Sequence, residues 1–142
     1  AGLNFKADAS LVPLTGGAAQ YGTKDVCLII CFYNDKYHEN ALDIISKMRK
    51  DKFFIQYTRE IKMEKNDVLK FFGGSFLGKM AQKGPVVALL CTGKSVVEES
   101  KKTASMLNAG KKNPVAYTTD GTEEGVNQID LFFSFSMGSL GM

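Results

Sequence analysis

The chain is 142 residues long, enough for one domain with a sizeable core, and 44% of its residues are hydrophobic and 23% charged. No apolar run approaches the ~20 residues of a membrane-spanning helix, and the scattered lysines behind the net charge of +3 give no argument for nucleic acid. An odd cysteine count and the lack of a long apolar segment at the start favour a reducing, cytoplasmic location.

Residues 1–24 are predicted to form an extended tail rather than core. Small and polar residues dominate them, Pro13 interrupts them, and residues 16–19 have no amphipathic period. Larger apolar side chains are spaced along this tail, and we expect them to anchor the chain on a protein partner: Phe5, Leu11, Val12, Leu14 and Tyr21. The folded domain is therefore predicted to span residues 25–142.

Strand-like and helix-like segments alternate from residue 25 onward. The apolar run 26–32 is typical of a buried central strand, and residues 40–50 carry apolar side chains at helical spacing. Residues 53–63 turn to aromatic and alternating character, which predicts a second strand. Two short helices are expected at 65–72 and 75–82, on either side of a glycine pair.

The second half of the chain completes a recognisable order of elements. A buried strand is predicted at 86–90 and a helix at 96–107, followed by a long polar loop over 108–130. Residues 131–137 alternate in their second half and are predicted to form the last strand. This order is typical of an α+β domain of the ferredoxin-like split βαβ type, with helices packed on a four-stranded antiparallel sheet.

Two glycine-containing motifs resemble ligand-binding loops but favour ordinary turns. Gly93-Lys94-Ser95 has the ending of a phosphate-binding P-loop, but the position of its first glycine is Ala88, inside a predicted strand. A turn in which Ser95 caps the next helix is the favoured interpretation. The stretch 120–131 has a glycine where a calcium loop requires one, but its twelfth position is Leu131 rather than Glu. An acidic, solvated turn is favoured there.

The cysteines and the single histidine give little support for a metal or catalytic site. Cys27 and Cys31 share one face of a predicted strand but have no further ligands nearby, so we expect them to be core thiols. His38 falls near the start of the first predicted helix, where a surface or capping role is far commoner than catalysis.

The third strand and the helix after it closely resemble the nucleoside diphosphate kinase family. The residues that carry the resemblance are Gly84-Pro85-Val86-Val87-Ala88 and the Val96-Val97 pair at the start of the helix. The order of elements over residues 25–137 also fits that family. The resemblance implies the same ferredoxin-like fold. Active members of that family transfer the γ-phosphoryl group of a nucleoside triphosphate to a catalytic His and then to a nucleoside diphosphate, with the assistance of Mg²⁺.

The resemblance also implies where the groups for this chemistry should lie, and several are replaced. Cys31 takes the place of a phosphate-binding Lys, and Lys101 takes the place of an Arg. The position of the aromatic residue that stacks on the base falls on Gly73, close to Phe71 and Phe72. A further Arg is expected in the long loop, yet residues 108–130 contain none.

The catalytic His of active members lies in the last strand, in an Asn-x-x-His-Gly-Ser motif. Matching Asn127 to the Asn of that motif places Asp130 at the His, whereas counting from the Asp120-Gly121 turn places Phe133 there. Because the sequence ends at Met142, we also expect the C-terminal helix of the family to be missing. Because phosphoryl transfer depends on positioning and charge neutralisation, we predict a pseudoenzyme without catalytic residues, metal or cofactor.

The favoured function is therefore that of a structural subunit in a larger protein assembly. Divergent members of the resembled family are frequently components of cilia and flagella, which implies an axonemal location in a radial spoke or on a doublet microtubule. One alternative is an enzyme or sensor that still binds nucleotide weakly through Lys101, Lys102 and the long loop. Another is a regulatory partner of an active kinase. Whether the chain self-associates is left open by its sequence.

Overall fold

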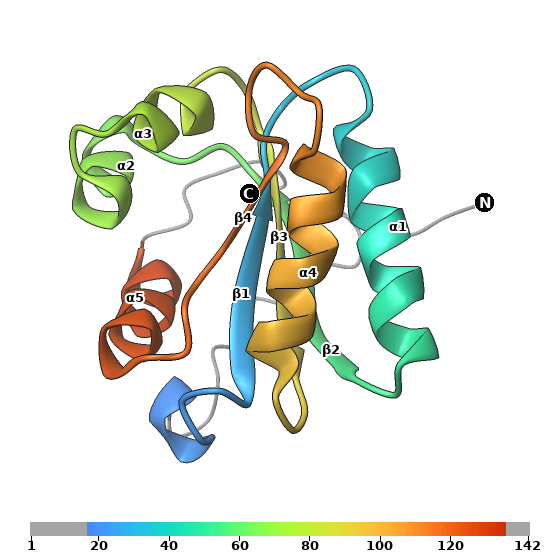
Figure 1. The fold of residues 1–142 in the computed structure, drawn as a ribbon. Helices are drawn as coiled ribbons and strands as arrows, with labels where there is room; N and C mark the ends of the chain where they lie inside the picture. The colour runs from blue at the N-terminus through green and yellow to red at the C-terminus, as the bar shows by residue number, and fades with distance from the viewer. Residues whose placement is uncertain (1–16, 136–142) are drawn as a thin grey trace.

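The computed structural model describes residues 17–135, which form a sheet between two layers of helices (Figure 1). The strands and helices are, in chain order, the 3-10 turn η1 (Ala18–Gln20), β1 (Val26–Cys31), α1 (Tyr37–Lys50), β2 (Phe54–Ile61), α2 (Lys65–Phe72), α3 (Phe76–Ala81), β3 (Val86–Thr92), α4 (Val96–Asn108), β4 (Ala116–Thr118) and α5 (Glu123–Ser134). The strand order is β2-β3-β1-β4 with every neighbouring pair antiparallel. This is the predicted ferredoxin-like fold class, because β3 lies between β1 and β2, and β1 lies between β3 and β4.

Two apolar cores lie on opposite faces of the sheet, because successive side chains of a strand point in opposite directions. Helices α1 and α4 cover one face, and α2, α3 and α5 cover the other (Figure 1). Strands β1 and β3 are buried along their whole length, as predicted for central strands. Among the described residues, no helix has the length and apolar character needed to cross a membrane.

The prediction for residues 108–137 was wrong. The last strand is β4, inside the expected loop, and residues 123–134 are helix α5 rather than loop and strand; residues 136 and 137 lie outside the described part. The apolar side chains Val126, Ile129 and Phe132 are buried at helical spacing. The alternation at the end of this segment was therefore part of a longer helical period.

Helix α5 begins with a side-chain cap, where the sequence was predicted to form an acidic, solvated turn. The Oγ1 atom of Thr122 accepts a hydrogen bond from the amide of Gly125 at 3.1 Å. Glu123 and Glu124 lie in the first turn, where acidic side chains favour the helix dipole. Gly125 is required because a Cβ atom there would overlap the carbonyl oxygen of Asp120. A helix start, rather than a calcium loop, explains these residues.

The part of the predicted tail that the structure describes packs on the domain. Ala18 is fully buried in the core, and its amide donates to Oδ1 of Asp130 on α5 at 2.7 Å. Tyr21 is half-buried against the same core, so its ring packs within its own chain. The other four expected anchors, Phe5, Leu11, Val12 and Leu14, lie outside the described residues. The packed region therefore starts before residue 25, the boundary expected from composition.

The turn between β3 and α4 has the expected position but a different cap. Strand β3 runs through Ala88 to Thr92, so no loop wraps a phosphate there. Ser95 adopts the left-handed conformation with φ 60°, and its side chain makes no cap hydrogen bond. Its amide instead donates to Oδ1 of Asp25 at 2.9 Å. The expected Ser95 side-chain cap was wrong, and Asp25 organises the turn instead.

The three cysteines are core residues, which confirms the prediction for Cys27 and Cys31 and adds Cys91. Cys27 and Cys91 face each other across the β1–β3 ladder. Burial raises the pKa of Cys27 to about 11, although hydrogen bonding to Thr119 opposes the shift, and burial raises the pKa of Cys31 to about 12. Thiolates are therefore scarce in the folded state at neutral pH.

We expect none of these thiols to react with a disulfide reagent in the folded protein near pH 8, because both burial and the raised pKa suppress attack. All three should react once guanidinium unfolds the chain. Absorbance of the released thiolate reports both reactions. A thiol that reacts in the folded chain as fast as free cysteine would contradict this arrangement.

Candidate functional site

The candidate site lies where β4, α2 and α5 meet on one face of the sheet. Because the family resemblance places the catalytic His in the last strand, β4 is the element to inspect, and it carries Ala116, Tyr117 and Thr118. The ring of Tyr117 packs against the core under α2 and α5. The positions expected for the His, Asp130 and Phe133, both lie on α5 instead. Both registers proposed from the sequence were therefore wrong.

Gln128 joins the three elements of this site. Its Oε1 atom accepts a hydrogen bond from the Tyr117 hydroxyl at 2.8 Å. Its Nε2 atom donates to the backbone carbonyl of Phe71 at 3.2 Å. Burial raises the pKa of Tyr117, and the hydrogen bond with Gln128 acts in the opposite direction. One amide side chain of α5 thus holds both the last strand and the end of α2.

Aromatic rings fill the space between these elements. The ring of Phe71 lies 6.1 Å from Tyr117, 6.0 Å from Phe132 and 6.5 Å from Phe135, and its contact with Phe72 is 4.7 Å. These pairs are edge-on, the arrangement that the ring quadrupole favours. Phe71 is almost fully buried by them. Its faces are consequently not open to a stacking base.

A cavity of about 420 Å³ remains at the rim of this aromatic cluster. Its lining residues all belong to the described part of the chain: Lys70, Phe71, Tyr117, Asp120, Glu124, Gly125, Asn127, Gln128 and Leu131. The cavity has one cationic side chain against two carboxylates. A phosphate chain needs several cations or backbone amides around it, so this lining is a poor match.

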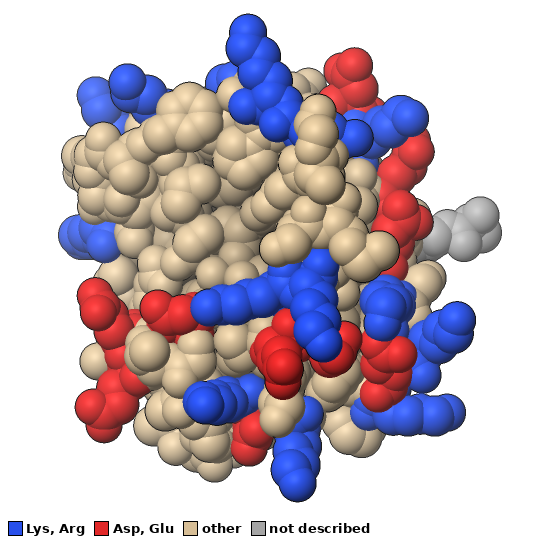
Figure 2. Space-filling model, viewed as in Figure 1, with Lys and Arg blue, Asp and Glu red and all other residues tan. Residues whose placement is uncertain are grey.

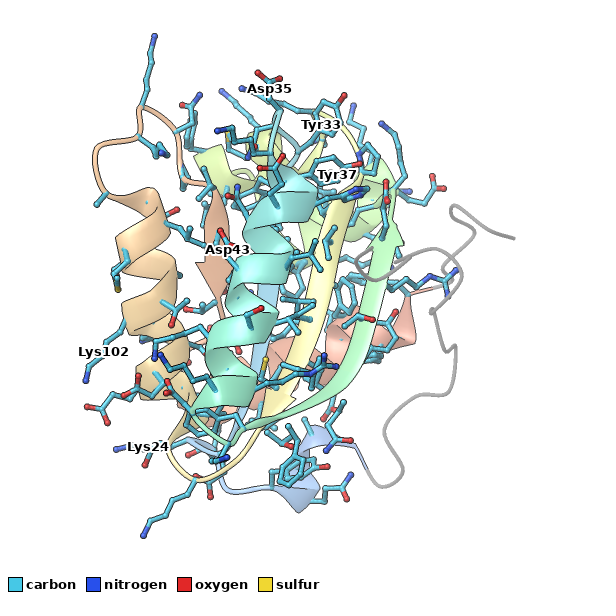
Figure 3. The ribbon with its side chains drawn as sticks, turned by 90° about the vertical axis from the view of Figure 1, so that its right-hand side faces the viewer. Lys24, Tyr33, Asp35, Tyr37, Asp43 and Lys102 are labelled. Atoms are coloured by element: carbon cyan, nitrogen blue, oxygen red, sulfur yellow. The ribbon has the colours of Figure 1, made fainter. Side chains whose placement is uncertain are left out.

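The cationic residues suggested by the sequence are not at this cavity. Lys101 and Lys102 are exposed on α4, which covers the opposite face of the sheet, and neither lines the cavity. Figure 3 shows Lys102 on the outer side of α4, pointing away from the sheet. Its Nζ atom lies 3.6 Å from Oε1 of Glu99 in the same helix. The structure does not bring these lysines and the aromatic cluster into one site.

Cys31 also lies away from this cavity. Its side chain belongs to the core under α1 and α4, whereas the next residue, Phe32, belongs to the core under α2 and α5. The ring of Phe32 packs 6.0 Å from that of Phe72. Phe32 is therefore the side chain that the end of β1 presents toward the site, and the placement of Cys31 at a phosphate position was wrong.

Asp130 and Phe133 have structural contacts. The carboxylate of Asp130 accepts the hydrogen bond from Ala18, and the ring of Phe133 packs edge-on against Tyr57 at 4.8 Å. Gly73 lies in the turn after α2, with open space where a side chain would be. None of these three positions supplies a reactive group to the cavity.

His38 takes part in a separate polar cluster that the sequence did not reveal. Glu60 is buried on β2, and its Oε2 atom accepts from the Tyr37 hydroxyl at 2.8 Å, while its Oε1 atom lies 2.8 Å from Nε2 of His38. Burial raises the pKa of Tyr37, and the hydrogen bond to Glu60 adds to the shift. Tyr33 packs beside Tyr37 at the start of α1 (Figure 3). The cluster ties α1 to β2.

Comparison with solved structures identifies the fold. The chain is similar to the nucleoside diphosphate kinase of Aquifex aeolicus, with 20% identity and a TM-score of 0.58 over 79% of this chain and 95% of that one. It is also similar to the nucleoside diphosphate kinase of Halobacterium salinarum solved with CDP, with 12% identity and a TM-score of 0.60 over 80% of this chain and 88% of that one. The chain has the nucleoside diphosphate kinase-like fold.

Sequence comparison identifies longer relatives. The chain is 28% identical over 143 residues to human Protein XRP2, covering 99% of this chain and 40% of that protein. It is 29% identical over 139 residues to Protein XRP2 of Danio rerio, covering 96% of this chain and 36% of that protein. The chain thus spans about two fifths of the length of these curated relatives. No protein-family model matches the sequence.

Proposed function

We propose that this chain is a nucleoside diphosphate kinase-like domain that does not transfer phosphate and that serves as a protein-binding, structural part of a larger assembly. The observation that carries the proposal is the filled site beside β4. Tyr117 and Phe71 occupy the space, Gln128 fixes them, and the remaining cavity has more carboxylates than lysines. In addition, the only histidine of the sequence lies on α1 and contacts Glu60.

The residues around this cavity are poorly suited to phosphoryl transfer. The reaction requires a nucleophile in line with the γ-phosphate and cations that neutralise its oxygens. Tyr117 is the polar side chain that β4 directs to this face, and its hydroxyl is engaged by Gln128. The raised pKa of Tyr117 keeps that hydroxyl protonated at neutral pH, which makes it a weak nucleophile.

We expect the full chain to show no transfer of the γ-phosphate from ATP to a deoxynucleoside diphosphate above the background without protein. Calorimetric titration with Mg·ATP and with ADP should release no binding heat at millimolar nucleotide. An active nucleoside diphosphate kinase is the positive control. Turnover, or saturable binding of either nucleotide, would overturn the proposal.

The alternative of a nucleotide sensor predicts a different result in the same titration. Binding would then be saturable, and the double substitution Lys101→Ala/Lys102→Ala would weaken it. The positions of these lysines on α4, with Lys102 beside Glu99, favour the non-binding proposal. A regulatory role toward an active kinase instead predicts stable mixed oligomers, which co-purification with that kinase would detect.

The proposed location, the cytoplasm and within it a ciliary or flagellar axoneme, comes from the family resemblance. The proposed tail anchors Phe5, Leu11, Val12 and Leu14 belong to the same proposal, whereas Tyr21 packs on its own chain. A tagged chain expressed in ciliated cells should remain along the axoneme after detergent extraction. Complete extraction, or a signal confined to other structures, would contradict this location without affecting the proposed lack of catalysis.

A further inference from the structure

The hairpin of α2 and α3 carries an apolar surface that the described chain does not cover. Leu69 on α2 is 47% exposed and Phe76 on α3 is 53% exposed. Phe72 and Leu77, from the same two helices, lie half-buried against the core. Burying these two exposed apolar side chains against a partner would be favourable, because transfer of apolar surface out of water lowers the free energy.

The hairpin is a compact unit, held by close packing between its two helices. Gly78 makes this possible, because a Cβ atom there would lie 3.1 Å from the carbonyl oxygen of Gly73 and 3.4 Å from Cγ1 of Val68. Val68 and Met80 are buried and fix the helices to the sheet. A partner would therefore meet a preformed surface, which lowers the entropic cost of binding.

The charges around this surface are mainly positive. The segment 62–83 contains exposed lysines and only two acidic residues, Glu64 and Asp67: the lysines are Lys62, Lys65, Lys70, Lys79 and Lys83. In Figure 2 the region over α2 and α3 is mostly uncharged with lysines at its border, while acidic side chains collect lower, over α5. Such an arrangement attracts an acidic partner and disfavours a basic one.

We propose that the α2–α3 hairpin docks an acidic, amphipathic segment of a protein partner. Apolar side chains of that segment cover Leu69 and Phe76, and its carboxylates lie against the surrounding lysines. This docking surface rests on the proposed protein-binding function of the chain. An anionic bilayer is the competing occupant of this surface, and binding to vesicles tests it.

Selection from a displayed library of random linear peptides, with the full chain immobilised, tests the proposal. Enriched peptides should combine acidic residues with Leu or aromatic residues. The most enriched peptide, made synthetically, should bind the double variant Leu69→Ser/Phe76→Ser at least about tenfold more weakly, as expected for loss of apolar anchors. It should also bind Lys70→Glu/Lys79→Glu more weakly, and its affinity should fall as salt is added.

The matched control is Phe54→Ser/Met106→Ser, which removes apolar side chains that are 66% and 74% exposed elsewhere on the surface. This variant should bind the peptide like the unmodified chain. Circular dichroism and thermal unfolding should show that the two double serine variants are folded, since the four apolar side chains they replace are exposed. Absence of enrichment, enrichment of peptides without acidic residues, or an equal loss in the control would overturn the proposal.

Vesicles of phosphatidylcholine and phosphatidylserine provide the other arm of the test. Binding to vesicles that is lost in Leu69→Ser/Phe76→Ser would assign the surface to a membrane and overturn the protein partner. The nucleotide titration on the same preparation separates this proposal from the previous one. Nucleotide binding would overturn the proposed function, whereas failed peptide selection without nucleotide binding would overturn the docking surface alone.

Discussion

Replacement of Phe132 by Ala is expected to lower the free energy of unfolding by about 3–5 kcal/mol. Phe132 is fully buried on α5, and its ring lies 6.0 Å from Phe71 and 6.0 Å from Phe135. Truncation removes apolar contacts and leaves a cavity between α5 and α2 that rigid neighbours fill only in part. Since a domain of this size has a total stability of about 5–15 kcal/mol, the loss would be a large share of it.

Urea unfolding followed by far-ultraviolet circular dichroism measures this effect, which suits a chain without Trp. Phe54→Ala is the matched control, because that ring is exposed at the start of β2, and we expect a change within about 0.5 kcal/mol. Equal losses for Phe132→Ala and Phe54→Ala would show that the aromatic cluster does not stabilise α5. A loss in Phe132→Ala that is below the expected range but above that of Phe54→Ala would indicate that α5 moves to fill the cavity.

Replacement of Asn108 by Ala is expected to lower the free energy of unfolding by about 2–4 kcal/mol. Three hydrogen bonds are lost, at about 1 kcal/mol each, and their backbone partners are left unsatisfied. Oδ1 of Asn108 accepts from the amides of Val115 at 2.7 Å and Ala116 at 3.1 Å. Nδ2 donates to the carbonyl of Ala116 at 3.1 Å. The side chain thus binds the outer edge of β4 as a further strand would.

Asn108→Asp is the informative comparison, because it keeps the acceptor for both amides and removes only the donor to Ala116. We expect its stability to lie between those of the unmodified chain and Asn108→Ala. Asn66→Ala, at an exposed position of α2, should have little effect. Hydrogen exchange should also accelerate at the Ala116 amide in Asn108→Ala. Unchanged exchange there would contradict the role of Asn108 at the edge of β4.

The elements with a strong hydrophobic period were predicted correctly from the sequence. The continuous apolar runs of β1 and β3 have one stable placement, between helices on both faces of a sheet. The spacing of Ala41, Ile44 and Ile45 likewise defines the buried face of α1. These apolar periods can be read within one segment, because the face that a strand or helix buries determines which of its positions are apolar.

The region after α4 was mispredicted because its strand is too short to show a period. Strand β4 spans only Ala116–Thr118, and its pairing with β1, together with the side chain of Asn108, holds it in place. With no period to mark that strand, the alternation of the aromatic residues at the end of α5 predicts a strand there instead. The Thr122 cap followed by two glutamates was the signal that could have corrected this.

The sequence by itself determined the fold class, through the order of buried runs and helical periods, and it determined that no His follows residue 38. Only the tertiary structure decided which side chains meet at the site. Cys31 and Phe32 are adjacent in sequence but face opposite cores, whereas Tyr117, Gln128 and Phe71 come together from three elements. The physical reason is that a site depends on strand pairing and on the face to which each side chain points, and long-range packing fixes both.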